Sequence, residues 1–111
     1  MKERKSGVLC DEKSGNISIY VNAYIDKGSL QISGQDLGED LIAFFGDSEY
    51  EYFYEFNEKN TKLLHEKLIA DCQQGKGLID FLEEHFSGID GCKNLRAFCK
   101  KNKVHYEFHV R

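Results

Sequence analysis

Acidic side chains are concentrated in one segment of the sequence, and their carboxylates limit the kinds of chemistry that this segment could perform. From Gly28 to Glu58 there are eight Asp or Glu residues and no Lys or Arg, which gives this segment a formal charge of −8. The flanking residues 1–27 and 59–111 carry formal charges of +1 and +3. Carboxylates in such numbers could act in general acid–base catalysis or dock a positively charged partner.

This pattern of carboxylates argues against general acid–base catalysis. Such catalysis needs a carboxyl group with a raised pKa in a desolvated pocket, whereas Glu49, Glu51 and Glu55 alternate along a predicted strand and should face water. The sequence also contains no nucleophile elbow, phosphate-binding glycine loop or metalloprotease helix motif. We therefore expect no catalytic residues and no enzymatic activity.

Histidines and cysteines form no recognisable metal-binding motif. The sequence has four cysteines without a CxxC pair, Cys10, Cys72, Cys92 and Cys99. In a cytoplasmic protein we expect these thiols to be reduced and structural. His105 and His109 share a predicted strand face, but residues four apart in a strand are separated by about 13 Å, too far to ligate one ion. His85 could meet Cys92 and Cys99, although core thiols beside a partly exposed imidazole are the simpler interpretation. No metal or cofactor is predicted.

Residues 49–56 alternate at the period of a β-strand. One side of this strand carries Tyr50, Tyr52, Tyr54 and Phe56, and the other carries Glu49, Glu51, Phe53 and Glu55. We expect the first side to face the core and the second to face water. Phe53, an apolar ring among carboxylates, has the composition of an interface anchor for a basic partner. The alternative is a solvated acidic strand that prevents the sheet from aggregating.

Length and composition predict one soluble domain. The chain has 111 residues, of which 41% are hydrophobic and 31% charged. No apolar run approaches the roughly 18 residues of a membrane span, and no signal-peptide core follows the charged N-terminus, so we expect a cytoplasmic protein. The net charge of −4 argues against a nucleic-acid ligand. Residues 1–15 are polar and are expected to be loosely ordered.

Hydrophobic periodicity separates the strands from the helices. It predicts strands at residues 16–25, 29–33, 49–56 and 104–110, with a loop at 34–38 and a short helical turn at 39–45. It predicts helices at residues 61–73, capped by Asn60 or Thr61, at 78–86, and from Asp90 onward. This order, ββ-β-ααα-β, predicts an α+β fold: an antiparallel sheet of about four strands with two to three helices packed on one face.

Three stretches of the sequence carry a resemblance to a family of small bacterial proteins. They are residues 28–38 (GSLQISGQDLG), 45–52 (FGDSEYEY) and 104–108 (VHYEF). The chain from about residue 28 to 111 resembles proteins of which some are similar to immunity proteins of contact-dependent growth inhibition and related polymorphic toxin systems. The resemblance implies a cytoplasmic protein that binds and neutralises a cognate nuclease toxin, such as an RNase or tRNase domain. It implies no catalytic residues.

The acidic segment is where we expect the toxin to bind. The predicted contact surface comprises Asp36, Glu39, Asp40, Asp47, Glu49, Tyr50, Glu51, Phe53 and Glu55. An acidic surface can occupy the basic cleft that a nuclease needs for its substrate, and complementary charge accelerates the encounter. The predicted partner is therefore a basic toxin domain, with no nucleic acid and no membrane involved. The alternative is a small binding or regulatory module with a different basic protein partner or a small-molecule ligand.

Overall fold

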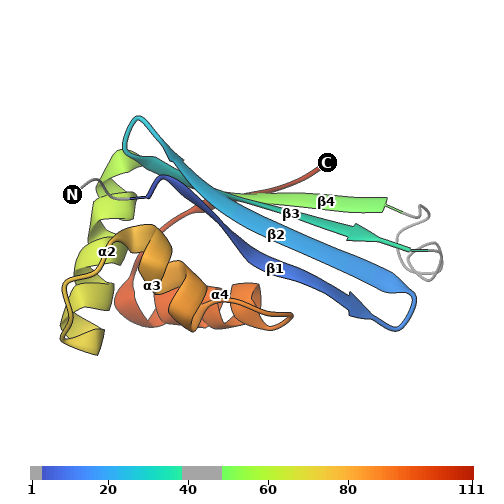
Figure 1. The fold of residues 1–111 in the computed structure, drawn as a ribbon. Helices are drawn as coiled ribbons and strands as arrows, with labels where there is room; N and C mark the ends of the chain where they lie inside the picture. Colours follow the sequence, from blue (N-terminus) through green and yellow to red (C-terminus); the bar gives the residue numbers. More distant parts are fainter. Residues whose placement is uncertain (1–3, 39–48) are drawn as a thin grey trace.

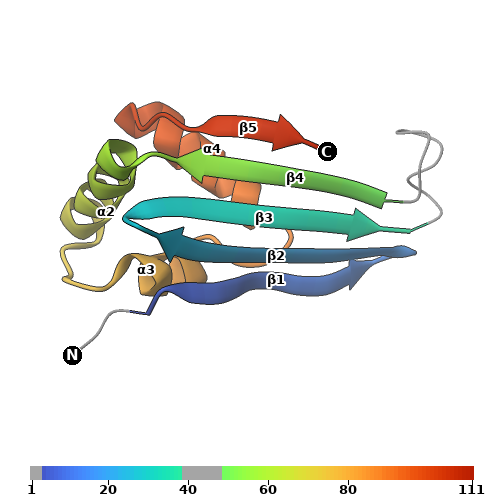
Figure 2. The ribbon, with the colours of Figure 1, turned by 90° about the horizontal axis from the view of Figure 1, so that it is seen from above.

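A five-stranded antiparallel sheet forms one layer of the protein, and the helices pack against one of its faces (Figure 1). The computed structural model describes residues 4–38 and 49–111. Its elements are β1 (Ser6–Ser14), β2 (Ile17–Asp26), β3 (Ser29–Leu37), β4 (Glu49–Phe56), α2 (Glu58–Cys72), α3 (Leu78–His85), α4 (Gly91–Asn102) and β5 (Glu107–Val110). The strands lie in the order β1-β2-β3-β4-β5, so each pairs with its neighbour in sequence and β1 and β5 form the edges (Figure 2). The predicted α+β class is confirmed, with one more strand than expected.

Strand β1 corrects the expectation that residues 1–15 are loosely ordered. Ser6–Ser14 pairs with β2 along its length, with a register shift between Val8 and Cys10. A β-bulge adds a residue to one strand, and here it allows the consecutive residues Leu9 and Cys10 to be buried together. The backbone oxygen of Leu9 accepts a hydrogen bond of 2.8 Å from the Gly88 N–H, beyond α3. The bulge breaks the period-two pattern that would have revealed the strand.

Strand β3 continues through the predicted loop at residues 34–38 and ends at Leu37. Glycine normally weakens a strand, but it is favoured where another group approaches the backbone closely. Gly34 is paired with Tyr52 of β4, and a Cβ atom at Gly34 would lie 2.1 Å from Cε2 of the Tyr52 ring. The aromatic ring therefore covers the glycine and takes the place of its missing side chain.

Helix α2 begins earlier than predicted because Asn57, and not Asn60 or Thr61, is its N-cap. The Asn57 side-chain oxygen accepts a hydrogen bond of 2.8 Å from the backbone N–H of Asn60. Thr61 is buried instead. Its Oγ1 accepts a hydrogen bond of 2.9 Å from the Leu30 N–H and donates one of 3.2 Å to the backbone oxygen of Phe56. This hydroxyl therefore joins α2 to the ends of β3 and β4.

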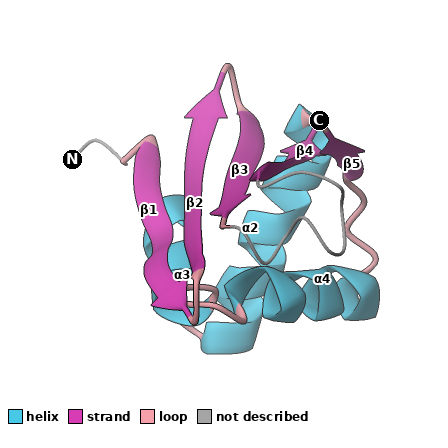
Figure 3. Cartoon of the chain, turned by 90° about the vertical axis from the view of Figure 1, so that its right-hand side faces the viewer, coloured by secondary structure: helices cyan, strands magenta, loops and turns pink. Residues whose placement is uncertain are grey.

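The core lies between the sheet and the helices. The sheet contributes Val21, Ala23, Leu30, Ile32, Tyr54 and Phe56, and the helices contribute Leu64, Leu68, Ile79, Phe81, Leu82, Leu95 and Cys99. The burial of Tyr54 and Phe56 confirms the predicted orientation of β4 at these positions. Figures 1 and 3 show α2, α3 and α4 on the same side of the sheet, so none of the helices in residues 4–38 and 49–111 lies over the opposite face.

Two ends of elements differ from the prediction in detail. Asp90 precedes α4 as predicted, but its side chain makes no capping hydrogen bond. The last strand is shorter than predicted, Glu107–Val110, because Lys103 adopts a left-handed conformation (φ 58°) that ends α4 and Val104 is buried in the core. The predicted helical turn at residues 39–45 lies outside the described residues.

Candidate interaction surface

The helix-free side of the sheet, called the open face below, brings together most of the described acidic residues of the predicted site. Alternation along β4 places Glu49, Glu51, Phe53 and Glu55 opposite the buried Tyr54 and Phe56. Across to β5, Phe53 pairs with His109 and Glu55 pairs with Glu107, so these side chains share the face. We define the acidic patch as Glu49, Glu51, Phe53 and Glu55 of β4 together with Glu107 of β5.

Phe53 occupies the middle of the acidic patch. It lies between Glu51 and Glu55 on its own strand, with Ser33 of β3 opposite on one side and His109 of β5 opposite on the other. Its side chain is half-buried although none of the described helices covers this face. An aromatic ring held by neighbouring strands loses little conformational freedom when a partner covers it. The position therefore suits an anchor in an interface.

The charges of the acidic patch are only partly balanced within the chain. Glu49 Oε1 accepts a hydrogen bond of 2.7 Å from Gln35 Nε2, a neutral group. Arg111 Nη1 lies 3.2 Å from Glu51 Oε2, and hydrogen bonding by Glu49 and by this guanidinium lowers the pKa of Glu51. Arg111 itself is three-quarters exposed, so it remains accessible to solvent or to a competing carboxylate. Among the described residues, no lysine forms an ion pair with the patch.

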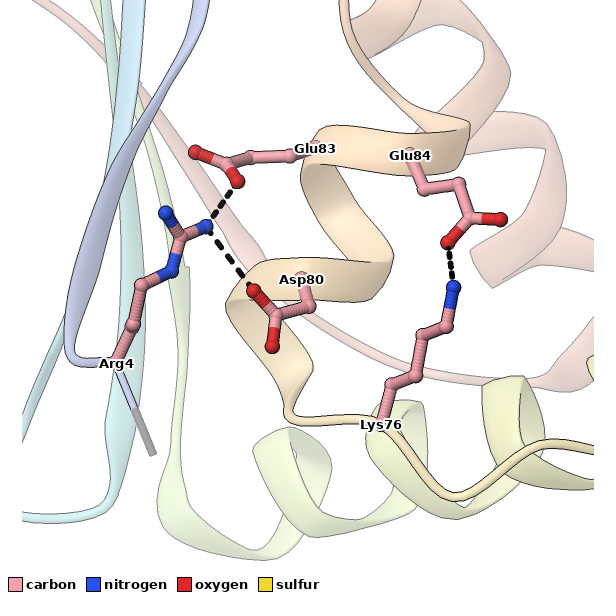
Figure 4. Close-up of polar contacts among 5 residues, drawn as sticks. All are labelled: Arg4, Lys76, Asp80, Glu83 and Glu84. Carbon is pink, nitrogen blue, oxygen red and sulfur yellow. Dashed lines mark hydrogen bonds and ion pairs between the residues drawn. The ribbon is translucent and has the colours of Figure 1, made fainter. Parts of the chain in front are cut away.

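The helical acids are paired differently. Arg4 forms ion pairs with Asp80, at 3.2 Å, and with Glu83, and Lys76 forms an ion pair with Glu84 (Figure 4). These contacts compensate the carboxylates of α3 with cations from elsewhere in the chain. The carboxylates of α3 are therefore compensated by Arg4 and Lys76, whereas Glu49 of the acidic patch accepts a hydrogen bond from a neutral amide and Glu55 and Glu107 lie beside the imidazole of His109.

Asp36 and Tyr50 do not belong to the open face. The prediction grouped them with Glu49, Glu51 and Glu55 in one contact surface, and the structure corrects it by placing them on the other side of the sheet. The two residues are paired across β3 and β4. Alternation from Tyr54 places Tyr50 on the helix side of the sheet, and its pairing places Asp36 there too. Which side chains of β3 share a face with those of β4 depends on the register between the two strands, and composition does not reveal that register. Glu39, Asp40 and Asp47 lie outside the described residues.

Asp36 is instead a partly buried carboxylate on the helix side. Its Oδ1 atom is buried without a hydrogen-bond partner among the described residues. Burial raises the pKa of Asp36, and a hydrogen bond with Tyr52 opposes that shift. Burial, and then the charge of Asp36, raise the pKa of Tyr52 well above its usual value. A carboxylate in this setting acts within the chain and is poorly placed for docking.

The cysteines are unpaired, as predicted, but one of them has an unexpected neighbour. Burial raises the pKa of Cys92 to about 11 and that of Cys99 to about 12. His85 does not meet these two thiols. Its Nε2 lies 3.3 Å from Sγ of Cys72, because the ends of α2 and α3 adjoin. The separation of 13 residues between Cys72 and His85 gives no motif from which this pair could be recognised.

A second grouping that the sequence does not reveal consists of His109 and two members of the acidic patch, Glu55 and Glu107. Nε2 of His109 is 3.4 Å from Oε2 of Glu107 and 3.6 Å from Oε2 of Glu55. His105, which was expected to share a strand face with His109, precedes β5, and its backbone N–H donates a hydrogen bond of 3.0 Å to Asn60 Oδ1. Glu107 and His109 alternate in the sequence, but their proximity to Glu55 depends on the pairing of β4 with β5.

A hollow of about 430 Å³ opens at the end of the sheet where β4 is followed by α2. Three carboxylates, Asp26, Glu55 and Glu107, lie around it. Its other lining residues include Gln31, Asn57, Asn60, His105 and Tyr106. The volume is within the range of small-ligand sites, but such sites are mostly apolar. The predominance of polar groups favours a cationic group over an apolar ligand.

Comparison with known proteins adds no further information. No protein-family model matches the chain, and no match was found among curated proteins or among solved structures. In the described part of the chain, no helix has both the length and the apolar character needed to cross a bilayer.

Proposed function

We propose that this chain is an immunity protein, which binds and neutralises a cognate toxin domain, a basic nuclease of the RNase or tRNase type. The observation that carries the proposal is the acidic patch: four carboxylates surround a half-buried phenylalanine on a sheet face that none of the described helices covers. One guanidinium, that of Arg111, pairs with these carboxylates within the described residues. The patch is thus already arranged for a positively charged partner.

The electrostatics of the patch favour rapid and specific association. Nucleases that act on RNA or DNA need a positively charged cleft for the phosphate backbone. A face of opposite charge steers the encounter and raises the association rate about 10- to 1,000-fold at low salt. Close charge pairs across a nuclease–inhibitor interface can couple by about 1.5–7 kcal/mol. Phe53 adds an apolar contact at the centre, where anchors contribute most.

A binding role accounts for the acidic patch better than catalysis does. Its members Glu49, Glu55 and Glu107 are exposed on a sheet face and do not line a desolvated cleft of the kind that acid–base catalysis requires. The same negative charge disfavours nucleic acid as a direct ligand. A cytoplasmic location belongs to this proposal, because an immunity protein must meet the toxin domain where the toxin acts.

The first test is whether a gene for a large secreted toxin lies directly upstream of this chain's gene, and the second is protection against the toxin domain that such a gene encodes. Cells expressing that domain should stop growing, and co-expression of the chain should restore growth. Changing Glu49, Glu51 and Glu55 together to Lys should abolish protection and binding. A matched triple variant, with Glu58, Glu66 and Asp71 of α2 changed to Lys, alters the net charge equally and should protect like the wild type.

Circular dichroism should show that both triple variants remain folded. If the chain fails to restore growth and does not bind the purified toxin domain, the proposed function is wrong. If the Glu49, Glu51 and Glu55 variant retains full affinity, the acidic patch is not the interface.

The polar hollow beside the patch favours one alternative, a regulatory module that binds a different basic protein or a small cationic ligand. Asp26, Glu55 and Glu107 would receive the positive group there. Such a module would not bind the toxin domain. Its binding would depend on Asp26, which lies outside the acidic patch, so an Asp26→Asn variant separates the two functions.

A further inference from the structure

Two adjacent strands hold three metal-binding side chains at one point of the open face. Strands β4 and β5 lie side by side (Figure 2). Glu55 of β4 is directly opposite Glu107 of β5, and His109 lies two residues further along β5 on the same face. One donor atom from each of these residues can be chosen so that all three lie within 4.8 Å of one another. The antiparallel ladder fixes the backbone beneath all three donors, so no segment has to move to bring them together.

The spacing of the donors differs from that of ordinary hydrogen bonds. Nε2 of His109 is 3.4 Å from Glu107 Oε2 and 3.6 Å from Glu55 Oε2. Hydrogen bonds between nitrogen and oxygen are about 2.7–3.2 Å long. Donors bound to one zinc ion at about 2.0–2.1 Å in a tetrahedral arrangement are separated by about 3.3–3.4 Å. The two distances from Nε2 of His109 are therefore close to the separation expected between two donors bound to one zinc ion.

We propose that Glu55, Glu107 and His109 form a binding site for one divalent transition-metal ion, with zinc as the best fit. One imidazole nitrogen and two carboxylate oxygens are a donor set that zinc accepts, whereas magnesium favours octahedral coordination by oxygen and water. The exposure of all three side chains leaves the fourth position for water. This inference concerns the isolated chain and does not depend on the proposed toxin.

Within the described residues, Cys72 and His85 are a further pair of donors that a metal titration must separate from this site. Cys72 Sγ and His85 Nε2 are 3.3 Å apart, and thiolate with imidazole is also a good zinc ligand set. The titration is therefore made with the full-length Cys72→Ser chain, in which this pair has lost its sulfur. Burial raises the pKa values of Cys92 and Cys99, which disfavours their thiolates as ligands.

Binding of Co²⁺ is measured first, through the visible absorption of the bound ion. Binding of Zn²⁺ is then measured by its competition with Co²⁺ and by calorimetry. Full-length Cys72→Ser protein, freed of metal with a chelator, should bind one equivalent of Co²⁺ with the intense spectrum of four-coordinate cobalt, and Zn²⁺ should displace it. Glu107→Gln and His109→Gln should each weaken binding about tenfold or more, because each removes a donor. His105→Gln, which leaves all three donors in place, should bind like its parent.

The proposal is overturned if the Cys72→Ser chain binds no Co²⁺ or Zn²⁺, or if Glu107→Gln and His109→Gln bind as well as their parent. Thermal unfolding of each variant without metal establishes that lost binding does not reflect lost structure. No toxin is present in this experiment, so its outcome and the outcome of the growth assay are independent of each other.

Discussion

Gly34 and Tyr52 are paired across β3 and β4, and the tyrosine ring fills the space where a side chain at position 34 would lie. A Cβ atom there would be 2.1 Å from Cε2 and 2.2 Å from Cζ of the ring. Gly34→Ala should therefore force the ring away and destabilise the protein by about 1–3 kcal/mol. Chemical denaturation measures the loss. In a Tyr52→Ala background the same substitution should cost much less, and an equal cost in both backgrounds would contradict the steric explanation.

The hydroxyl of Thr61 joins α2 to two strands and should be costly to remove. It accepts a hydrogen bond from Leu30 N–H and donates one to the oxygen of Phe56. Thr61→Val leaves the buried Leu30 donor unsatisfied, which should lower the free energy of unfolding by about 1–3 kcal/mol. Thr61→Ser retains the hydroxyl and is the control. Amide exchange at Leu30 should accelerate in the valine variant alone; unchanged exchange there would argue against this hydrogen bond.

Asp36 should make stability decrease with rising pH. Burial raises its pKa in the folded chain above the value in the unfolded chain. The folded chain therefore retains a proton that the unfolded chain loses, and the stability contributed by that proton is lost as pH rises through the folded-state pKa. Asp36→Asn should raise the melting temperature at pH 7, while below about pH 3.9, near the unfolded pKa, the difference should disappear. Asp71→Asn on the exposed part of α2 should change little. A variant equally stabilised at pH 3 and pH 7 would refute this account.

Phe53 should matter for partner binding more than for folding. Truncating a central aromatic anchor typically costs about 2 kcal/mol or more of binding free energy. With the upstream toxin domain, Phe53→Ala should weaken binding mainly through faster dissociation, as measured by surface plasmon resonance. Val8→Ala, on the open face of β1, is the matched control because Val8 is 48% exposed and distant in the sheet order from β4. Similar losses in both variants would remove the special role of Phe53.

Cys72 should be the first thiol to react with an alkylating reagent. Burial raises the pKa values of Cys10, Cys92 and Cys99, which slows their conversion to the reactive thiolate. Cys72 is only half-buried, and Nε2 of the neighbouring His85 lies 3.3 Å from its sulfur. Brief treatment with iodoacetamide followed by peptide mass spectrometry should find the label at Cys72. His85→Phe should slow this labelling, and preferential labelling of Cys92 would contradict the prediction.

The sequence predicted the sheet where alternation is regular and failed where local geometry interrupts it. Ile17–Asp26 and Glu49–Phe56 alternate cleanly and were identified as strands. The strand Ser6–Ser14 was missed because its bulge places Leu9 and Cys10 together in the core. The strand Ser29–Leu37 was cut short because Gly34 signals a loop unless the ring that covers it is known.

The candidate site was predictable within a strand and unpredictable between strands. The period of two placed Glu49, Glu51, Phe53 and Glu55 on one face, and the structure agrees. Asp36 was predicted to lie in a loop, and its position on the helix side of the sheet depends on the register of β3 against β4. The proximity of Glu107 and His109 to Glu55 depends in the same way on the register of β4 against β5. Register arises from the packing of the whole sheet, which one strand's sequence does not contain.

The described helices α2, α3 and α4 all lie on one side of the sheet, which separates the residues that maintain the fold from those on the open face. Ile32 and Phe56 point toward these helices, while Phe53 and Glu55 point away from them. Substitutions among the outward residues can therefore change the surface without disturbing the core beneath it. In the proposed immunity protein, this separation would let the contact residues diverge with the toxin while the buried framework stays constant.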